Sequence, residues 1–275
     1  MERILTNNEI ADSNYQVDIA GLSEREVAEN FYLCPMELIY IYHSGFVIEG
    51  SDFSLLIDYY QDTPDRFVHT KFLNRPGRLY ILASHSHPDH FTPEILEWRN
   101  VRPDIQYIFS EDIRNKGQAC FHDAIYLRKG EEWGNGQIRI KAFGSTDIGI
   151  SFLIDIDNIR IFHAGDLNNW HWEEESTPEE IQEAQENYFR ELETLSRETS
   201  YLDLALFPVD PRLGKDYTRG ARQFIDRIQT HQFAPMHFWE KYAEANAFRD
   251  YAEAHGGRFI AIHKPGEVIK LETKN

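Results

Sequence analysis

Short apolar runs separated by turn residues recur along the chain from residue 37 onward and predict a strand-rich protein. The first three runs, over 38–42, 46–49 and 54–58, predict consecutive strands with an antiparallel start. The same pattern predicts the remaining strands over 79–84, 105–109, 125–127, 137–143, 150–154, 159–162, 202–207, 233–236, 258–262 and 267–271.

Helical periodicity marks fewer segments than the strand pattern does. Apolar residues at helical spacing and helix-start signals predict helices over 24–31, 92–98, 178–197, 218–231 and 242–255. The first of these helices belongs to an N-terminal extension over 1–36, to which we assign no chemistry. Residues 37–275 contain no repeat, linker or low-complexity tract and are predicted to form one α/β domain.

The apolar run that begins at residue 79 has the length and composition of a buried strand, and it ends at Ser84. Pro88 prevents the run from continuing as a ladder strand, because proline has no amide hydrogen to donate. The residues after Ser84 are therefore predicted to lie in a loop at the end of this strand.

That loop carries four metal-ligand side chains within six residues. His85 and His87 point to the same side of an extended backbone, as two ligands of one ion must. Asp89 and His90 follow the break, where the chain turns and can reach a second position. Imidazole together with carboxylate suits zinc, manganese or iron far better than calcium.

This His-x-His-x-Asp-His loop resembles the signature of the metallo-β-lactamase superfamily. The resemblance covers about residues 37–275 and implies a four-layered αββα sandwich. The segments Gly-Ser-Thr-Asp-x-Gly, over 144–149, and His-Ala-Gly-Asp-Leu-Asn, over 163–168, look most like the ascorbate-6-phosphate lactonase-like branch.

The resemblance also implies a centre with two ions. Asp166 would bridge both ions, His85 and His87 would hold the first, and Asp89, His90 and His237 would hold the second. A metal-bound hydroxide would be the nucleophile, because metal binding brings the pKa of water near neutrality. Asp89 and Asp166 are the predicted catalytic residues, and Asp89 could orient the hydroxide or take up its proton.

One ligand of the superfamily pattern is missing. Most members carry a third histidine for the first ion between the ligand loop and the bridging aspartate, whereas residues 144–147 contain none. Asp147 could serve there as an oxygen ligand, or the first site could be open and weakly held. We therefore expect two zinc ions as cofactors, with manganese or iron as alternatives.

Four further residues are candidates for substrate contact or for support of the ligands. His43 is either a pocket residue or a structural histidine in a bend, and Asp58 is a predicted acceptor for a ligand imidazole. His171 is flanked by two tryptophans that could wall a substrate pocket. Arg212 is either an anion contact or a partner in a surface salt bridge.

Charge and composition narrow the classes of partner. The 275 residues carry a formal net charge of −18, a balance that argues against nucleic acid and anionic membrane as partners. The two cysteines, Cys34 and Cys120, indicate no disulfide framework. Because neither a signal peptide nor an apolar run of membrane-spanning length is recognisable, we expect a cytoplasmic location.

These observations predict a metal-dependent hydrolase acting on a small, anionic, ester-like substrate such as a phosphodiester or a lactone. The expected partner is that small molecule, and a homo-oligomer is left open. The alternative from another class is a non-hydrolytic metal-binding sensor or an iron-containing redox module on the same fold.

Overall fold

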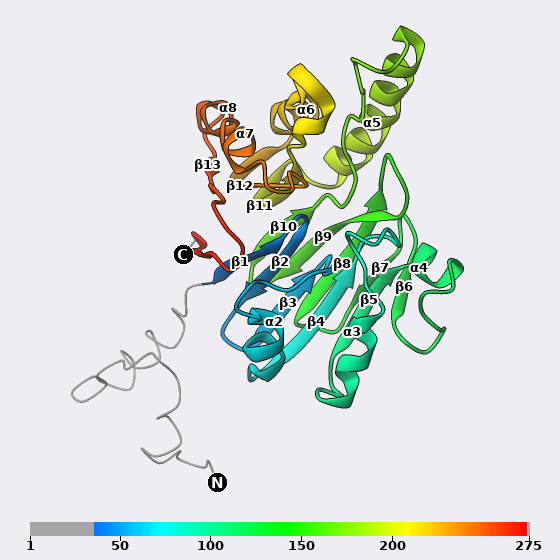
Figure 1. Ribbon diagram of the computed structural model, residues 1–275, viewed down its shortest axis with the longest axis vertical. Helices are drawn as coiled ribbons and strands as arrows, with labels where there is room; N and C mark the ends of the chain where they lie inside the picture. Colours follow the sequence, from blue (N-terminus) through cyan, green and yellow to red (C-terminus); the bar gives the residue numbers. More distant parts are fainter. Residues whose placement is uncertain (1–35, 274–275) are drawn as a thin grey trace, which may run out of the picture. The chain divides into compact units, whose positions relative to one another are not determined.

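The computed structural model describes residues 36–273. In these residues the strands form two seven-stranded sheets that pack face to face (Figure 1). The first sheet has the order β14-β1-β2-β3-β4-β5-β6. Its strands are β1 (Glu37–Tyr42), β2 (Gly45–Glu49), β3 (Phe53–Ile57), β4 (Arg78–Ala83), β5 (Gln106–Ser110), β6 (Ile125–Leu127) and β14 (Val268–Lys270).

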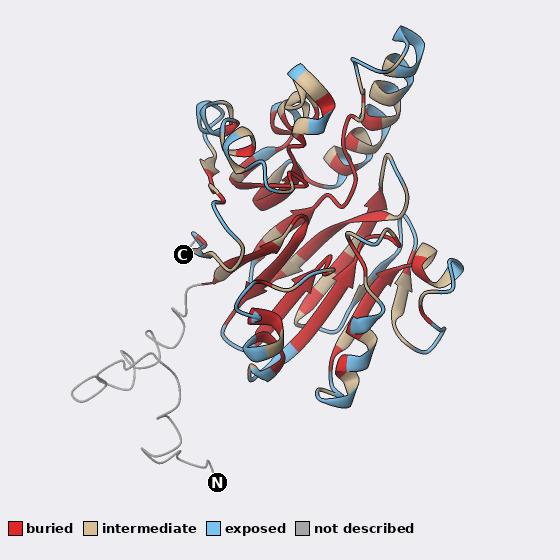
Figure 2. Ribbon diagram, in the orientation of Figure 1, coloured by how far each residue is buried: buried red, intermediate tan, exposed pale blue. Residues whose placement is uncertain are grey.

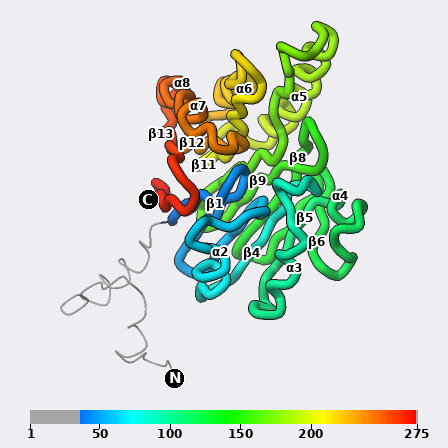
Figure 3. The backbone as a smooth tube through the Cα atoms, in the orientation of Figure 1, coloured from blue at the N-terminus to red at the C-terminus, as the bar shows by residue number. Residues whose placement is uncertain are grey.

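The second sheet has the order β13-β12-β11-β10-β9-β8-β7. Its strands are β7 (Glu132–Gly134), β8 (Ile138–Gly144), β9 (Ile150–Ile156), β10 (Ile159–His163), β11 (Tyr201–Pro208), β12 (Gln229–Met236) and β13 (Arg258–Phe259). Both sheets are mixed. In the first sheet the pairs from β14 to β3 are antiparallel and those from β3 to β6 parallel, whereas in the second the pairs from β13 to β10 are parallel and those from β10 to β7 antiparallel. Figure 3 follows the chain from β1 of the first sheet, in blue, to the strands of the second sheet and back to the first at its red C-terminal end.

Successive side chains of β4 point to opposite faces of the first sheet and show how the layers form. Tyr80 and Leu82 pack in the core between the two sheets, whereas Leu79, Ile81 and Ala83 belong to a second core on the outer face of the first sheet. A strand buried on both faces reads as a continuous apolar run, which is how the sequence of β4 reads. Figure 2 shows this burial as red strands under helices with exposed outer faces.

Helices cover the outer face of each sheet. Those of the first sheet are α2 (Phe67–Thr70), α3 (Glu94–Glu97) and α4 (Glu111–Asn115), and those of the second are α5 (Pro178–Glu198), α6 (Arg219–Arg227), α7 (Tyr242–Asn246) and α8 (Arg249–Ala254). The predicted four-layered αββα sandwich is therefore confirmed. None of the helices in residues 36–273 is long and apolar enough to cross a membrane.

The long helix α5 begins where its sequence signals place it. Thr177 and Glu180 form a reciprocal capping box, and Pro178 occupies the first turn, where its missing amide hydrogen costs nothing. The helix predicted over 24–31 lies outside the described residues. The division into an extension over 1–36 and a domain over 37–275 stays a prediction.

Two predicted helices were wrong in extent. The helix predicted over 218–231 ends at Arg227, because Gln229 already pairs with Tyr201 in the parallel ladder between β11 and β12. The helix predicted over 242–255 is divided into α7 and α8. The division buries Phe248, whose ring centroid lies 5.1 Å from that of Phe233. In both cases packing against the second sheet overrides the local helical pattern.

Candidate metal centre

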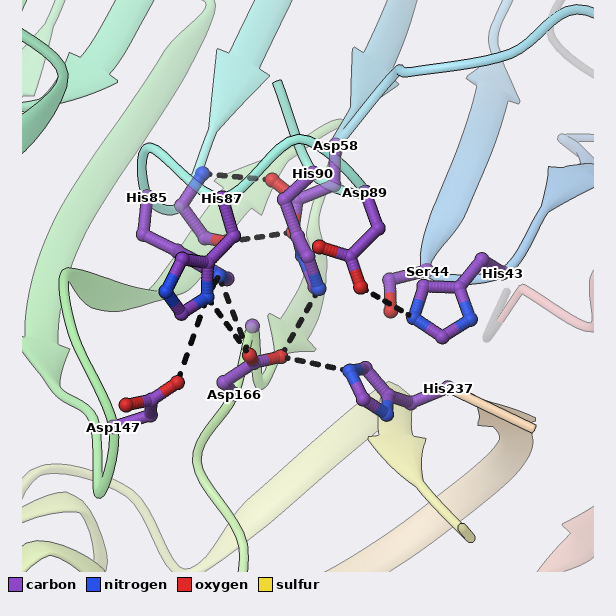
Figure 4. Close-up of polar contacts among 12 residues, drawn as sticks. His43, Ser44, Asp58, His85, His87, Asp89, His90, Asp147, Asp166 and His237 are labelled. Carbon is purple, nitrogen blue, oxygen red and sulfur yellow. Dashed lines mark hydrogen bonds and ion pairs between the residues drawn. The ribbon is translucent and has the colours of Figure 1, made fainter. Parts of the chain in front are cut away.

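The predicted site residues follow strands that run in one direction, so both sheets deliver them to the same edge. In the first sheet β1 and β3 are both antiparallel to β2, and β3 is parallel to β4. In the second sheet β8 and β10 are both antiparallel to β9, and β10, β11 and β12 are parallel. Figure 4 shows the result, a cluster formed by His43, Asp58, His85, His87, Asp89, His90, Asp147, Asp166 and His237.

The His85–His90 loop is held close to the segment that carries Asp147. The amide of Ile150 donates to the carbonyl oxygen of Ser84, and Gly149 adopts a φ of +77° beside it. A Cβ at Gly149 would lie 2.2 Å from the carbonyl oxygen of Ser84, so this position requires glycine. The close approach brings the 144–149 segment to the first two histidines of the loop.

Asp166 lies at the centre of the cluster, and its two carboxylate oxygens face different sets of histidines. Oδ2 is 3.3 Å from Nε2 of His85 and 4.0 Å from Nδ1 of His87. Oδ1 is 3.1 Å from Nε2 of His90 and 3.3 Å from Nε2 of His237. This is the arrangement in which one carboxylate can bridge two cations (Figure 4).

On the Oδ2 side, His85, His87 and Asp147 form what we call the His87 half of the centre. Nδ1 of His87 lies 3.5 Å from Oδ2 of Asp147 and 3.0 Å from Nε2 of His85. Ligand atoms of His87, Asp147 and Asp166 all lie within 4.8 Å of one another. Asp147 thus occupies a position from which an oxygen could replace the missing histidine.

On the Oδ1 side, His43, Asp89, His90 and His237 form the His237 half. Their ligand atoms also lie within 4.8 Å of one another. The ring centroid of His43 is 4.1 Å from that of His237, and its Nε2 lies 3.3 Å from Oδ2 of Asp89. His43 therefore takes part in this half directly, whereas the sequence pattern indicated a pocket or structural residue.

Hydrogen bonds at the rear of the rings leave the facing nitrogens free. Nδ1 of His90 bonds Asp58 at 2.8 Å, and Nδ1 of His237 bonds Asp210 at 2.9 Å. Asp58 is fully buried and also accepts hydrogen bonds from the amide and hydroxyl of Ser84. Such contacts fix the orientation and tautomer of metal-binding imidazoles.

Several facing atoms are buried without a hydrogen-bond partner among the described residues. Nε2 of His90 and Oδ1 of Asp166 approach each other without forming a hydrogen bond, and both ring nitrogens of His43 are likewise unsatisfied. Unsatisfied polar atoms are costly in a protein interior, and a shared cation would satisfy several of them at once. The donor set of imidazoles and carboxylates fits zinc, manganese or iron.

The pKa shifts of Asp166, Asp89 and His43 agree with a site that binds cations. Burial opposes ionisation of Asp166, yet His90 and His237 hold the pKa of its carboxyl well below the ordinary value. Burial likewise opposes ionisation of Asp89, yet the imidazole of His43, whose Nε2 lies 3.3 Å from Oδ2 of Asp89, keeps the pKa of that carboxyl low. Burial, reinforced by His237, lowers the pKa of His43 to about 4. The carboxylates are therefore anionic at neutral pH and His43 is neutral, the forms in which each can bind a cation.

Backbone strain gathers around the same centre. Five non-glycine residues near it have positive φ, namely His43, Asp58, Trp172, His237 and Trp239. Such conformations cost on the order of 1–3 kcal/mol each and tend to cluster at functional sites. The fold therefore maintains unfavourable backbone geometry at the place where it positions these side chains.

Two predicted residues have contacts outside the centre. The ring of His171 faces the backbone carbonyl of Asp216 and the amide of Glu173, so the structure does not bring it to the cluster. Arg212 forms a bidentate ion pair with buried Asp210, and its Nη2 lies 3.3 Å from Nδ1 of His237. Arg212 therefore lies beside the centre, and its ion-pair partner Asp210 was not predicted from the sequence.

Sequence reasoning missed Asp210 and Ser84 as supporting residues. Asp210 follows β11 at the same sheet edge as the other site residues, so its place after a buried strand was the available signal. Ser84 directly precedes the ligand loop, but nothing in its sequence context indicates that its hydroxyl contacts both Asp58 and Nδ1 of His85.

Comparison with known proteins gives one family match. The family model described as a beta-lactamase superfamily domain matches residues 37–182. A curated protein from Desulforamulus reducens, named UPF0173 metal-dependent hydrolase, is 22% identical over 255 residues, covering 86% of this chain and 100% of that protein. One of the same name from Pelotomaculum thermopropionicum is 24% identical over 259 residues, with coverage of 86% and 100%.

Solved structures show the same fold at low sequence identity. Igni18, a metallo hydrolase from Ignicoccus hospitalis, has a TM-score of 0.62 at 17% identity, covering 87% of this chain and 99% of its own. The metallo-beta-lactamase fold protein YhfI from Bacillus subtilis has a TM-score of 0.61 at 14% identity, covering 86% and 99%. CmlA, a diiron beta-hydroxylase from Streptomyces venezuelae, has a TM-score of 0.58 at 15% identity, covering 86% and 54%.

Proposed function

The chain belongs to the β-lactamase superfamily, and from this membership and the geometry of its histidine and aspartate cluster we propose a metal-dependent hydrolase with a two-ion centre. The observation that carries the proposal is the placement of Asp166, whose two oxygens face separate sets of nitrogen ligands. Two relatives that match this chain over their full lengths are named metal-dependent hydrolases, which supports the same activity here.

The residues of the centre would hold the ions, and Asp89 would in addition act on water. His87 and Asp147 would hold one ion, together with His85, whose Nε2 faces the same oxygen of Asp166 as His87 does. His43, Asp89, His90 and His237 would hold the other, with Asp166 between them. When bound, such ions supply Lewis-acid chemistry and lower the pKa of water. Asp89 is the partly exposed carboxylate of the His237 half, with a side chain 25% exposed, and is placed to orient a water molecule or take up its proton.

We further propose the identity of the ions, the class of substrate and the location of the protein. The ions are two zinc ions, with manganese or iron as alternatives because Asp147 adds an oxygen ligand. The substrate is a small anionic ester-like molecule, a phosphodiester or a lactone, as in the ascorbate-6-phosphate lactonase-like branch that the sequence resembles. The strongly negative net charge supports a small molecule over nucleic acid, and we propose action in the cytoplasm.

The proposal is tested with purified protein and a panel of chromogenic esters, phosphodiesters and lactones, assayed with and without added zinc, manganese and iron. We expect metal-dependent turnover of at least one class and its loss in Asp166→Asn. Asp250→Asn, an exposed change on α8, is the matched control and should leave turnover unchanged. Turnover that survives chelation or Asp166→Asn would contradict the proposal.

An iron-containing redox module is the second candidate, and Asp147 is the observation that favours it. An oxygen ligand in place of imidazole favours a harder ion than zinc at the His87 half. Elemental analysis and visible absorbance separate the two candidates, since iron colours the protein and zinc does not. Stoichiometric iron with no turnover of the ester panel would favour the redox module.

A further inference from the structure

Aromatic side chains and one arginine form a closed series of contacts beside the His237 half. Ring centroids of Trp170 and His237 are 5.3 Å apart, and Trp170 stacks on Trp172 at 6.2 Å. The Arg212 guanidinium carbon lies 6.0 Å from the ring centroid of Trp172 and 6.0 Å from that of Trp239. Trp239 contacts His43 at 4.1 Å, which closes the series because His43 contacts His237.

Two tyrosines extend this series outward from Trp239. Their ring centroids lie 6.3 Å (Tyr42) and 6.5 Å (Tyr60) from that of Trp239. The three tryptophans and both tyrosines are only partly buried, so their ring surfaces are partly accessible to a ligand. We call the set the aromatic-arginine face, made of Tyr42, Tyr60, Trp170, Trp172, Arg212 and Trp239.

Arg212 is held in a fixed orientation and retains donors for a ligand. Its Nε and Nη2 bond both oxygens of buried Asp210, while its side chain is 47% exposed. Its Nη1 donates to no other residue in the described part of the chain. A guanidinium fixed in this way can meet a carboxylate or phosphate at little entropic cost, because its side chain is already ordered.

The opposite side of the centre has a different chemistry. At the His87 half the exposed groups are the polar side chains of His87 and Asp147, which are 42% and 45% exposed. A substrate bound over Asp166 would therefore meet carboxylate and imidazole on one side and flat apolar rings with a cation on the other. Flat rings bind planar groups by stacking, and the cation adds a preference for an acid substituent.

We propose that the aromatic-arginine face binds the part of the substrate that is not hydrolysed and selects small aromatic acids, in which a planar ring carries a carboxylate or phosphate. The hydrolytic step itself rests on the function proposed above, whereas binding at this face does not depend on turnover. The competing structural explanation is that the rings only secure their loops, as the Trp170 Nε1 hydrogen bond to the backbone oxygen of Asp166 would allow.

Calorimetric titration of the metal-loaded protein with three small probes separates these explanations. Benzoate presents an aromatic ring and a carboxylate together, acetate presents the carboxylate alone, and benzyl alcohol presents the ring without an acid. Since benzoate and acetate offer metal ions the same carboxylate, a difference between them reports the ring contact. We expect benzoate to bind at least about tenfold more tightly than either of the other two.

Variants assign the preference to individual residues. Trp172→Leu should weaken benzoate binding about threefold to tenfold and leave acetate unchanged, with Trp172→Phe restoring most of the loss. Arg212→Gln should weaken both anions about tenfold and leave benzyl alcohol unchanged. Phe121→Leu and Arg197→Gln, exposed changes outside the face, are the matched controls, and metal content is verified in every variant.

The outcomes distinguish this inference from the proposed function. Equal binding of benzoate and acetate, or a benzoate preference that Trp172→Leu leaves undiminished, would overturn the inference even if the protein hydrolyses an ester. The expected preference in a protein that turns over nothing would support the inference and count against the hydrolase.

Discussion

The two halves of the metal centre differ in how firmly the fold holds them. In the His237 half the rings of His43, His90 and His237 are buried, and the latter two are braced from behind by Asp58 and Asp210. In the His87 half only His85 is buried and braced, by the hydroxyl of Ser84, while His87 and Asp147 are exposed. One carboxylate therefore joins a rigid site to a loose one.

The difference follows from which strands supply the ligands. The His237 half draws on β1, β4 and β12, each of which pairs with a neighbouring strand on both sides. Asp147 instead belongs to the connection between β8 and β9 and has, besides His87, a hydrogen bond from its own amide to the hydroxyl of Ser145. Ligands that must be ordered on binding cost affinity, so the His87 half should bind its ion more weakly.

The largest effect is expected from Asp166→Asn, which removes the negative charge shared by both halves. With no bridging carboxylate, two cations about 4 Å apart would repel each other unshielded. We expect loss of both ions and of all metal-dependent turnover, measured by elemental analysis and by the ester panel. Metal content and turnover close to wild type would show that the halves are not joined through this residue.

A matched pair of alanine variants tests whether the halves bind independently. His237→Ala should remove the ion of the His237 half, and His87→Ala the ion of the other, so that each variant retains about one ion per chain. The reason is that each ring faces a different oxygen of Asp166. Unchanged metal in both variants would contradict the assignment, and loss of both ions in each would show one cooperative site.

Asp58→Asn tests the bracing of the His237 half without touching a ligand. Asparagine keeps the size of the side chain but removes the charge that orients His90. Loss of such support commonly lowers metal affinity about 10–100-fold, and we expect this loss at the His237 half. Competition with a chromogenic chelator measures it. An equal loss at both halves would show that Asp58 supports both, His90 directly and His85 through the hydroxyl of Ser84.

The smallest effect is expected at Asp147, the exposed ligand candidate. Asp147→Asn should lower affinity at the His87 half by about tenfold and spare the other half, because an amide oxygen carries no charge. Ser145→His should act in the opposite direction for zinc by supplying the imidazole that the sequence lacks. Tolerance of Asp147→Asn by both halves would assign Asp147 to the turn before Gly149 instead.

The loop from His85 to His90 could be predicted because its chemistry is local, with strand, break and ligand spacing all within a few residues. Asp166 was predicted through the family resemblance, with its position after a buried strand as support. Asp210 also follows a buried strand and could have been predicted in the same way, although only Arg212 was predicted in that loop. Such positions can be predicted because parallel strands bring their carboxyl ends to the same edge of the sheet.

Contacts between distant segments could not be predicted in this way. His43 joins the His237 half through a left-handed backbone conformation at the turn between β1 and β2 and through its contact with His237. Likewise, Trp170 beside His171 contacts His237, while the ring of His171 bonds elsewhere. The helix ends near Arg227 and Phe248 were wrong for a related reason, since pairing and burial in the second sheet decide them.

Stepwise calorimetric titration of the metal-free protein with zinc tests the central claim most directly. We predict two binding steps, a tight one that His237→Ala abolishes and a weaker one that Asp147→Asn weakens further. Two tight steps of equal affinity, unmoved by Asp147→Asn, would contradict the account of one rigid and one loose half.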